Sequence, residues 1–89
     1  MVVREVIVTN RAGLHTRPAS MIVRTASKFD SDFFIQKDSY EINGKSIIGV
    51  MTLAAEQGAT LSLTFEGEDE AAAADAIAEL FESGFGEVK

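Results

Sequence analysis

Four short stretches of the chain have the alternation or the composition of β-strands. Residues 60–65 alternate most regularly, with leucine or phenylalanine on one face and serine or threonine on the other. Residues 2–8 are rich in valine, although Arg4 interrupts their apolar face. Two further strands are predicted at 32–37 and 40–42, with a turn between them.

Apolar residues recur at helical spacing between these strands. From position 19 onward, alanine, isoleucine and valine occupy i, i+3, i+4 and i+7, which predicts a helix over 16–27. Similar spacing after Ser46 predicts a short helix that is capped by this serine and ends at Gln57 and Gly58. Its β-branched residues and Gly49 are poor helix formers, so packing must hold this helix.

The last quarter of the chain predicts a third helix. Glu68, Asp69 and Glu70 place negative charge at its start, where the helix dipole favours it. A buried apolar stripe is predicted from Ala73 to Gly84, and the glycines at its end predict that the last few residues fray.

The predicted order is strand, helix, strand, strand, helix, strand, helix, which indicates an α+β fold. Regular alternation in at least one strand implies a sheet that is covered on one face only. No linker, internal repeat or low-complexity tract interrupts the chain, so we expect residues 1–89 to form one domain.

Composition excludes several classes of function. The chain has no cysteine and one histidine, which rules out disulfides, thiolate metal sites and histidine clusters, and we expect neither a metal nor a cofactor. A net charge of −6 argues against nucleic-acid binding. No apolar run has membrane-spanning length and no signal peptide is evident, so we expect a cytoplasmic protein without membrane insertion.

The charges are unevenly distributed along the chain. Arg11, Arg17 and Arg24 lie within ten residues of the single histidine, His15, whereas acidic residues crowd the last quarter. A basic spot on an acidic protein steers acidic partners to one face. The acidic tail itself we interpret as a solvated helix.

The single histidine and the single proline lie in one stretch, from Gly13 to Ser20. Because proline is tolerated in the first turn of a helix, Pro18 places a helix start near Thr16 and His15 at its mouth. Unpaired N–H groups at such a start attract anions, phosphate above all, and Arg17 adds a fixed cation. A titratable ring beside an anion site indicates a histidine that carries a phosphoryl group.

The chemistry of such a ring follows from its surroundings. The positive helix end and Arg17 disfavour the imidazolium, so we expect a neutral ring with a nucleophilic nitrogen. Helix-start N–H groups and Arg17 are suited to stabilise the charge on a phosphoryl group in transfer. The alternative is that His15 is an ordinary exposed residue before a helix, as most lone histidines are.

The heptapeptide Gly13–Ala19, GLHTRPA, resembles the active-site motif of the HPr family, the histidine-containing phosphocarriers of the bacterial phosphoenolpyruvate-dependent sugar phosphotransferase system. A second block, residues 45–51, resembles the regulatory-serine segment of that family. The two blocks stand at the family's separation, and the resemblance covers essentially the whole chain. It implies an open-faced β-sandwich, in which three helices cover one face of a four-stranded antiparallel sheet.

The resemblance also implies roles for residues of the first block. His15 corresponds to the phosphoryl-accepting histidine, which in the family uses its Nδ1, and Arg17 corresponds to the charge-stabilising arginine. Thr16 and Arg17 supply helix-start N–H groups that bind phosphate, and Pro18 shapes that turn. Ala54 replaces a glycine common in the kinase-regulated type, a change that we expect to be benign.

Ser46 has a structural interpretation as a helix cap, because serine is among the best N-cap residues. The resemblance adds a second role, as the serine targeted by an ATP-dependent HPr kinase/phosphorylase where that enzyme exists. A phosphate on Ser46 would place negative charge beside apolar side chains that are hard to bury in so small a domain and that we interpret as a docking patch. The partner-binding positions that we expect are Ser20, Arg24, Ile47, Ile48 and Met51.

The partners implied by the resemblance are enzyme I, enzyme IIA domains and, in some bacteria, a catabolite-control transcription regulator. The leading hypothesis is therefore a monomeric phosphocarrier with a covalent intermediate on His15 and no autonomous catalysis. Two alternatives stay open. One is a regulatory binding module that acts through Ser46 and residues 47–51, and the other is a paralogue that serves a nitrogen-related phosphorelay.

Overall fold

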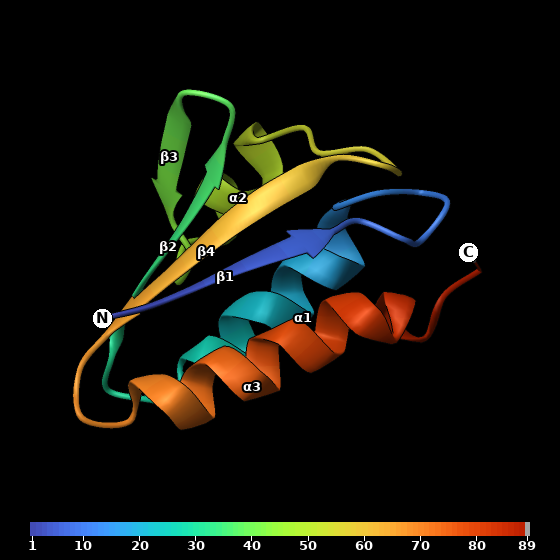
Figure 1. Ribbon diagram of the computed structural model, residues 1–89. Coiled ribbons are helices and arrows are strands. Elements are labelled where there is room, and N and C mark those ends of the chain that lie inside the picture. Colours follow the sequence, from blue (N-terminus) through green and yellow to red (C-terminus); the bar gives the residue numbers. More distant parts are fainter. Residues whose placement is uncertain (89) are drawn as a thin grey trace.

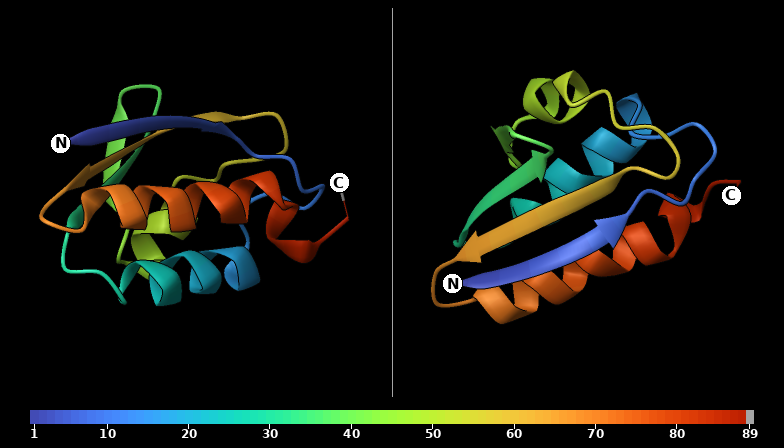
Figure 2. Two further views of the ribbon diagram at one scale, coloured as in Figure 1. Left: turned by 60° about the horizontal axis from the view of Figure 1, so that its bottom comes forward. Right: turned by 45° about the horizontal axis from the view of Figure 1, so that its top comes forward.

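The computed structural model describes residues 1–88. The elements, in chain order, are β1 (Val2–Ile7), α1 (Thr16–Ala26), β2 (Asp32–Lys37), β3 (Tyr40–Asn43), α2 (Ile47–Thr52), β4 (Thr60–Glu66), α3 (Glu70–Glu82) and the 3-10 turn η1 (Gly84–Gly86). The strands form one antiparallel sheet in the order β1-β4-β2-β3. Figures 1 and 2 show the three helices on one face of this sheet and none on the other, which confirms the predicted open-faced α+β fold.

Strand β4 lies at the centre of the core, as its regular alternation predicts. Leu61, Leu63 and Phe65 are at most 1% exposed and point toward the helices. The pairing of β2 with β4 sets Phe33 opposite Phe65, and the two rings stack with centroids 4.6 Å apart. Phe34 points to the open face, where it stays partly exposed. Each buried side chain of this size contributes roughly 1.5–3 kcal/mol.

Helix α1 begins at Thr16 and carries Pro18 in its first turn, as predicted. Ala19, Ile22 and Ala26 are buried, so the apolar spacing read from the sequence is the face that packs on the core. The helix contacts both α2 and α3. Packing against these two helices therefore fixes the position of Thr16, the first residue of α1, at one end of the helical layer.

Helix α2 is shorter than predicted: it ends at Thr52 rather than near Gln57. Leu53 caps the helix, and Ala54 then adopts a left-handed backbone with φ 49°, which turns the chain out of the helix. Apolar spacing alone does not reveal this break, because Leu53 stays buried just beyond the helix end. The other element boundaries fall within two residues of the predicted ones.

The prediction that the last few residues fray is wrong for residues 84–88, and Lys89 lies outside the described residues. Gly84, Phe85 and Gly86 all have positive φ, between 57° and 72°, and they turn the chain back after α3. Phe85 is 1% exposed and meets Phe81 edge to face, with ring centroids 5.0 Å apart. The N–H of Arg11 donates to the carbonyl of Val88 at 2.7 Å, so Val88 lies against the loop after β1 (Figure 1).

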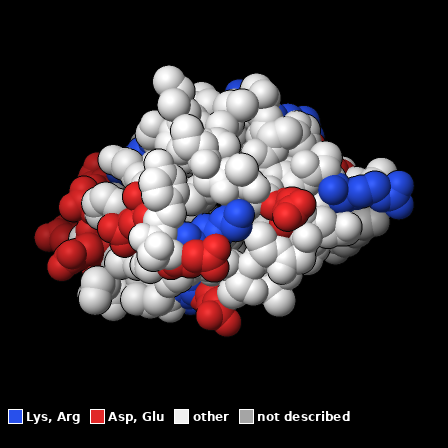
Figure 3. Space-filling view, turned by 90° about the horizontal axis from the view of Figure 1, so that it is seen from above, with Lys and Arg blue, Asp and Glu red and all other residues white. Residues whose placement is uncertain are grey.

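The opposite end of the molecule is acidic. There the loop from α1 to β2 meets the turn from β4 to α3, and acidic side chains gather at this end of the face in Figure 3. The carboxylate of Asp69 accepts hydrogen bonds from the hydroxyl of Ser31 and from the N–H groups of Asp30 (2.8 Å) and Ser31 (3.0 Å). These hydrogen bonds hold the pKa of Asp69 below its ordinary value, and the bond from the Ser31 hydroxyl has the largest effect.

Candidate functional site

The loop between β1 and α1 brings His15 to the start of the helix. Gly13 has φ 73°, and an added Cβ would lie 2.5 Å from the carbonyl oxygen of Ala55, so no other residue fits there. The next residue, Leu14, donates its N–H to the same carbonyl at 2.9 Å. His15 then donates its N–H to Gly13 O at 3.0 Å and becomes the N-cap of α1.

His15 is an unusual N-cap, because its side chain makes no capping hydrogen bond. Its carbonyl accepts the first helical bond, from the N–H of Ala19 at 3.0 Å. Pro18 has no N–H, and the first N–H groups of a helix have no intrahelical partner. The N–H groups of Thr16 and Arg17 are therefore left without a capping side chain, beside a ring that is 43% exposed. This is the arrangement that the sequence predicts for an anion site.

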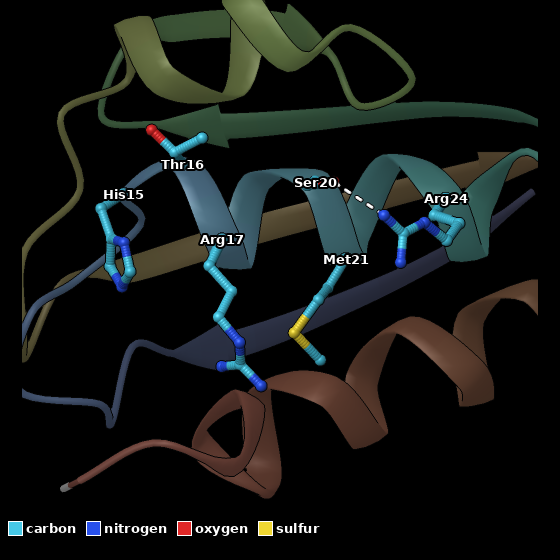
Figure 4. Close-up of a pocket in the computed structure, with 6 residues that line it drawn as sticks. All are labelled: His15, Thr16, Arg17, Ser20, Met21 and Arg24. Atoms are coloured by element: carbon cyan, nitrogen blue, oxygen red, sulfur yellow. Dashed lines mark hydrogen bonds between the residues drawn. The ribbon is translucent and has the colours of Figure 1, made fainter.

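Five of the ten predicted site residues line one open depression of about 640 Å³ on the surface of α1 (Figure 4). The ring of His15 stands at one end of it and the guanidinium of Arg24 at the other. Arg24 lies 3.4 Å from the hydroxyl of Ser20. The lining residues are His15, Thr16, Arg17, Ser20, Met21 and Arg24. Pro18, by contrast, is buried on the other side of the helix.

The carboxylate of Glu87 contacts the ring from the C-terminal segment. Its two oxygens lie 2.9 and 3.0 Å from Nε2 of His15. Nη1 of Arg17 donates to Oε2 of Glu87 and to the carbonyl of Phe85, both at 2.9 Å. The buried amide of Asn10 donates to Oε1 of Glu87 at 3.0 Å and to the carbonyl of Gly13 at 2.8 Å.

These contacts lower the pKa of Glu87 from 4.5 to about 2. The hydrogen bond from His15 has the largest effect, and those from Arg17 and Asn10 add to it, while burial acts in the opposite direction and raises the pKa. An ionised carboxylate can only accept, so the proton of the contact must sit on Nε2. In a neutral ring with its proton on Nε2, the nitrogen that is left as an acceptor is Nδ1. No ring nitrogen of His15 other than Nε2 has a hydrogen-bond partner among residues 1–88.

Neither Glu87 nor Asn10 is predicted from the sequence as part of the site. Glu87 is 72 residues from His15 and belongs to the acidic quarter, which we interpreted as a solvated helix. One signal was present: Phe85, a large apolar residue, stands between two glycines directly before Glu87. That pattern indicates a tight turn that anchors a side chain in the core rather than a loose end.

The family model described as PTS HPr component phosphorylation site matches residues 2–83. The chain belongs to the HPr family. A phosphocarrier protein HPr from Treponema pallidum is 52% identical over 87 residues, which cover 98% of this chain and 99% of that protein. The crystal structure of an HPr from Thermoanaerobacter tengcongensis matches with a TM-score of 0.95 at 44% identity, over all of both chains. This HPr-family chain is thus a phosphocarrier-type protein of the phosphotransferase system.

The HPr family also includes regulatory relatives. Crh, a catabolite-repression protein of Bacillus subtilis, matches with a TM-score of 0.76 at 39% identity, over 94% of this chain and 97% of that one, and it forms a dimer with a swapped domain. Within the described residues of this HPr-family chain, no helix is long and apolar enough to cross a membrane. The same residues contain no cluster of histidine and acidic side chains that could hold a metal.

The second block of the HPr-family sequence forms a separate surface on α2. Ser46 caps this helix, and its hydroxyl accepts the N–H of Gly49 at 3.0 Å, which confirms the structural role expected from the sequence. Ile47, Ile48 and Met51 are 41%, 77% and 42% exposed. These three side chains, here called the apolar patch, stand on the solvent side of α2, while Val50 packs into the core.

Proposed function

We propose that this chain relays a phosphoryl group from phospho-enzyme I to enzyme IIA domains through a covalent intermediate on His15. The observation that carries the proposal is the position of the ring: it stands half-exposed at the open start of α1, beside Arg17 and the N–H groups of Thr16 and Arg17. A helix start and a guanidinium together form a site for a doubly charged anion.

The proposed transfer needs only the groups of this site and the two partners. Nδ1 of His15 attacks phosphorus with its lone pair, the Nδ1–P bond forms, and the donor's N–P bond breaks with its electron pair returning to the donor nitrogen. Charge on the equatorial oxygens is stabilised by the helix-start N–H groups and by Arg17, while Pro18 fixes the turn that aims them. The second step is the same displacement in reverse, with the acceptor on the IIA domain as nucleophile.

Regulation through Ser46 is the second candidate function. It is favoured by the exposure of the apolar patch and by the similarity to Crh. Phosphorylation of Ser46 by an HPr kinase/phosphorylase would place about two negative charges beside the apolar patch and repel acidic partners. We expect Ser20 and Arg24 to face the same partners, and a catabolite-control regulator to bind the phosphoserine form. We place this activity in a cytoplasmic monomer.

The test is intact mass after incubation with phosphoenolpyruvate and enzyme I, with His15→Ala in parallel. We expect an acid-labile gain of one phosphoryl group in the wild type and none in His15→Ala. A second arm measures the initial rate for Ser46→Asp, which we expect to be slower than that for Ser46→Ala because only the aspartate adds charge. An undiminished gain in His15→Ala would overturn the carrier role, and equal rates for the two Ser46 variants would overturn the regulatory one.

A further inference from the structure

The C-terminal segment is held against the site by backbone geometry that is costly to form. Phe85 has φ 57°, a left-handed conformation that is unfavourable for any residue with a Cβ. It is retained because the ring of Phe85 is buried against Phe81. The two flanking glycines, Gly84 and Gly86, adopt the same region without strain. The turn redirects the chain so that Glu87 comes back to the start of α1.

Hydrogen bonds hold the C-terminal segment on both sides of Glu87. Before it, the carbonyl of Phe85 accepts from Arg17; after it, the carbonyl of Val88 accepts from the N–H of Arg11. The Glu87 side chain is only 17% exposed, although it ends in a charge. Asn10, fully buried, holds Oε1 of this carboxylate and also the carbonyl of Gly13 in the loop that leads to His15. Asn10 therefore holds both the carboxylate and the loop that carries the ring.

We propose that Glu87 is a positioning residue for the phosphoryl transfer: by accepting the proton of Nε2 it fixes the ring, so that the lone pair of Nδ1 faces the start of α1. This inference rests on the function proposed above and assigns to it a residue outside both sequence blocks. Figure 4 shows the ring of His15 at the start of α1, and the contacts of its Nε2 with Glu87 are 2.9 and 3.0 Å long. A carboxylate that fixes a histidine tautomer in this way has a known parallel in the catalytic triads.

The carboxylate also complements the charge that develops on the ring. When Nδ1 forms its bond to phosphorus, the ring keeps its proton on Nε2 and becomes a phosphoimidazolium with a positive charge. Glu87 already faces that proton, so the charge forms beside a counter-ion that is in place before the reaction. No proton has to move, and the donor nitrogen leaves with the electron pair of the broken N–P bond. Arg17 contacts the same carboxylate through Nη1 and retains its other donors for the phosphoryl oxygens.

The first measurement is the state of the ring in the absence of any partner. Nitrogen-15 NMR of the wild type is expected to show His15 with its proton on Nε2, as a downfield proton signal that exchanges slowly with water. Glu87→Gln keeps an oxygen that accepts this proton, so the protected signal is expected to persist. Glu87→Ala removes the acceptor, so the signal is expected to be lost to exchange. A signal equally protected in the alanine variant would overturn the proposal.

The second measurement is the rate of phosphoryl transfer from phospho-enzyme I. For Glu87→Ala we expect kcat to fall by about tenfold or more, the size of effect seen when a histidine loses the group that orients it. Glu87→Gln keeps the orienting oxygen and loses only the counter-ion, so its kcat should fall below that of the wild type but less than that of Glu87→Ala. KM should stay within about twofold, because Glu87 acts on the ring rather than on the partner. The matched control is Glu68→Gln, which removes the same charge from the exposed turn between β4 and α3 and should retain the wild-type rate.

The outcomes separate this inference from the carrier role. A wild type that gains no phosphoryl group on His15 contradicts the proposed function, whatever the NMR shows. A wild type that is phosphorylated while the Glu87 variants react at its rate contradicts the positioning role alone. A faster reaction in Glu87→Ala would also overturn it, because the carboxylate would then compete with the phosphoryl group for Arg17.

Discussion

At the residue scale, the chemistry of His15 depends on charges from both ends of the chain. The local sequence contributes cations, Arg17 and the helix start, and these were the basis for expecting a neutral, nucleophilic ring. The structure adds the carboxylate of Glu87, which contacts both Nε2 of His15 and Nη1 of Arg17. A pattern within a few residues of the histidine contains no information on a group 72 residues away. His15 and Arg17 were thus predictable as a pair, and their anionic partner was not.

The depressed pKa of Glu87 gives the stability a pH dependence with a definite sign. Because its pKa is about 2 in the folded state and ordinarily 4.5, the unfolded state takes up the proton first as the pH falls. The stability contributed by the ionised carboxylate is complete above about pH 5. It is lost progressively as the pH falls toward 2. The side chains of His15, Arg17 and Asn10 make the hydrogen bonds to this carboxylate.

Urea denaturation of the wild type and Glu87→Gln checks this at pH 6, 4 and 2.5. We expect the wild type to be the more stable at pH 6 and the difference to shrink toward pH 2.5. Asp69 and Glu70, whose pKa values are also lowered, are common to both proteins and cancel in the comparison. If the difference in free energy of unfolding stays constant over this range, the contact with His15 does not lower the pKa of Glu87.

At the element scale, the sequence predicts the regular parts of the fold and misses the residues that end them. Alternation in β4 and helical spacing in α1 each extend over enough residues to identify the buried face. The end of α2 is set instead by Ala54, an alanine in the left-handed region, and nothing in an alanine indicates positive φ. The glycines around Phe85 were interpreted as loosening, because a glycine needed for its φ looks the same in sequence as a flexible one.

The expectation that alanine is benign at position 54 is wrong, because Ala54 adopts a left-handed backbone with φ 49°. This strain predicts a stabilising substitution. A residue with a Cβ destabilises the folded state by roughly 1–2 kcal/mol in this region, and glycine removes that strain. Glycine also makes the unfolded chain more flexible, which lowers the free energy of unfolding by roughly 0.5–1 kcal/mol. We therefore expect Ala54→Gly to raise the free energy of unfolding by about 0.5–1 kcal/mol. Ala12→Gly is the matched control, since Ala12 is exposed and has no positive φ, and it should lower stability. Two variants that are equally destabilised would show that Ala54 is not strained.

At the scale of the whole molecule, the two ends of the helical layer have different roles. One end carries the exposed acidic side chains of the loops around Asp30 and Glu68. The other end gathers the start of α1, the loop after β1 and the C-terminal segment, with the candidate site between them (Figure 2). Negative charge is thus concentrated away from the face on which we expect a phosphoryl group and acidic partners to arrive.

The last prediction concerns the C-terminal segment as part of the core. Phe85 is 1% exposed, so Phe85→Ala should lower the free energy of unfolding by about 3 kcal/mol, the usual cost of removing a buried phenylalanine. Val88→Ala, at a side chain that is 66% exposed, should change it by less than about 0.5 kcal/mol. Urea denaturation measures both.

The same pair of variants links this packing to the site. If burial of Phe85 is what returns Glu87 to the ring, Phe85→Ala should also weaken the protection of the Nε2 proton of His15, and Val88→Ala should leave it intact. The opposite result, a destabilised Phe85→Ala that keeps full protection, would mean that Asn10 and Arg17 alone hold the carboxylate. A Phe85→Ala no less stable than Val88→Ala would mean that the segment packs on the core without stabilising it.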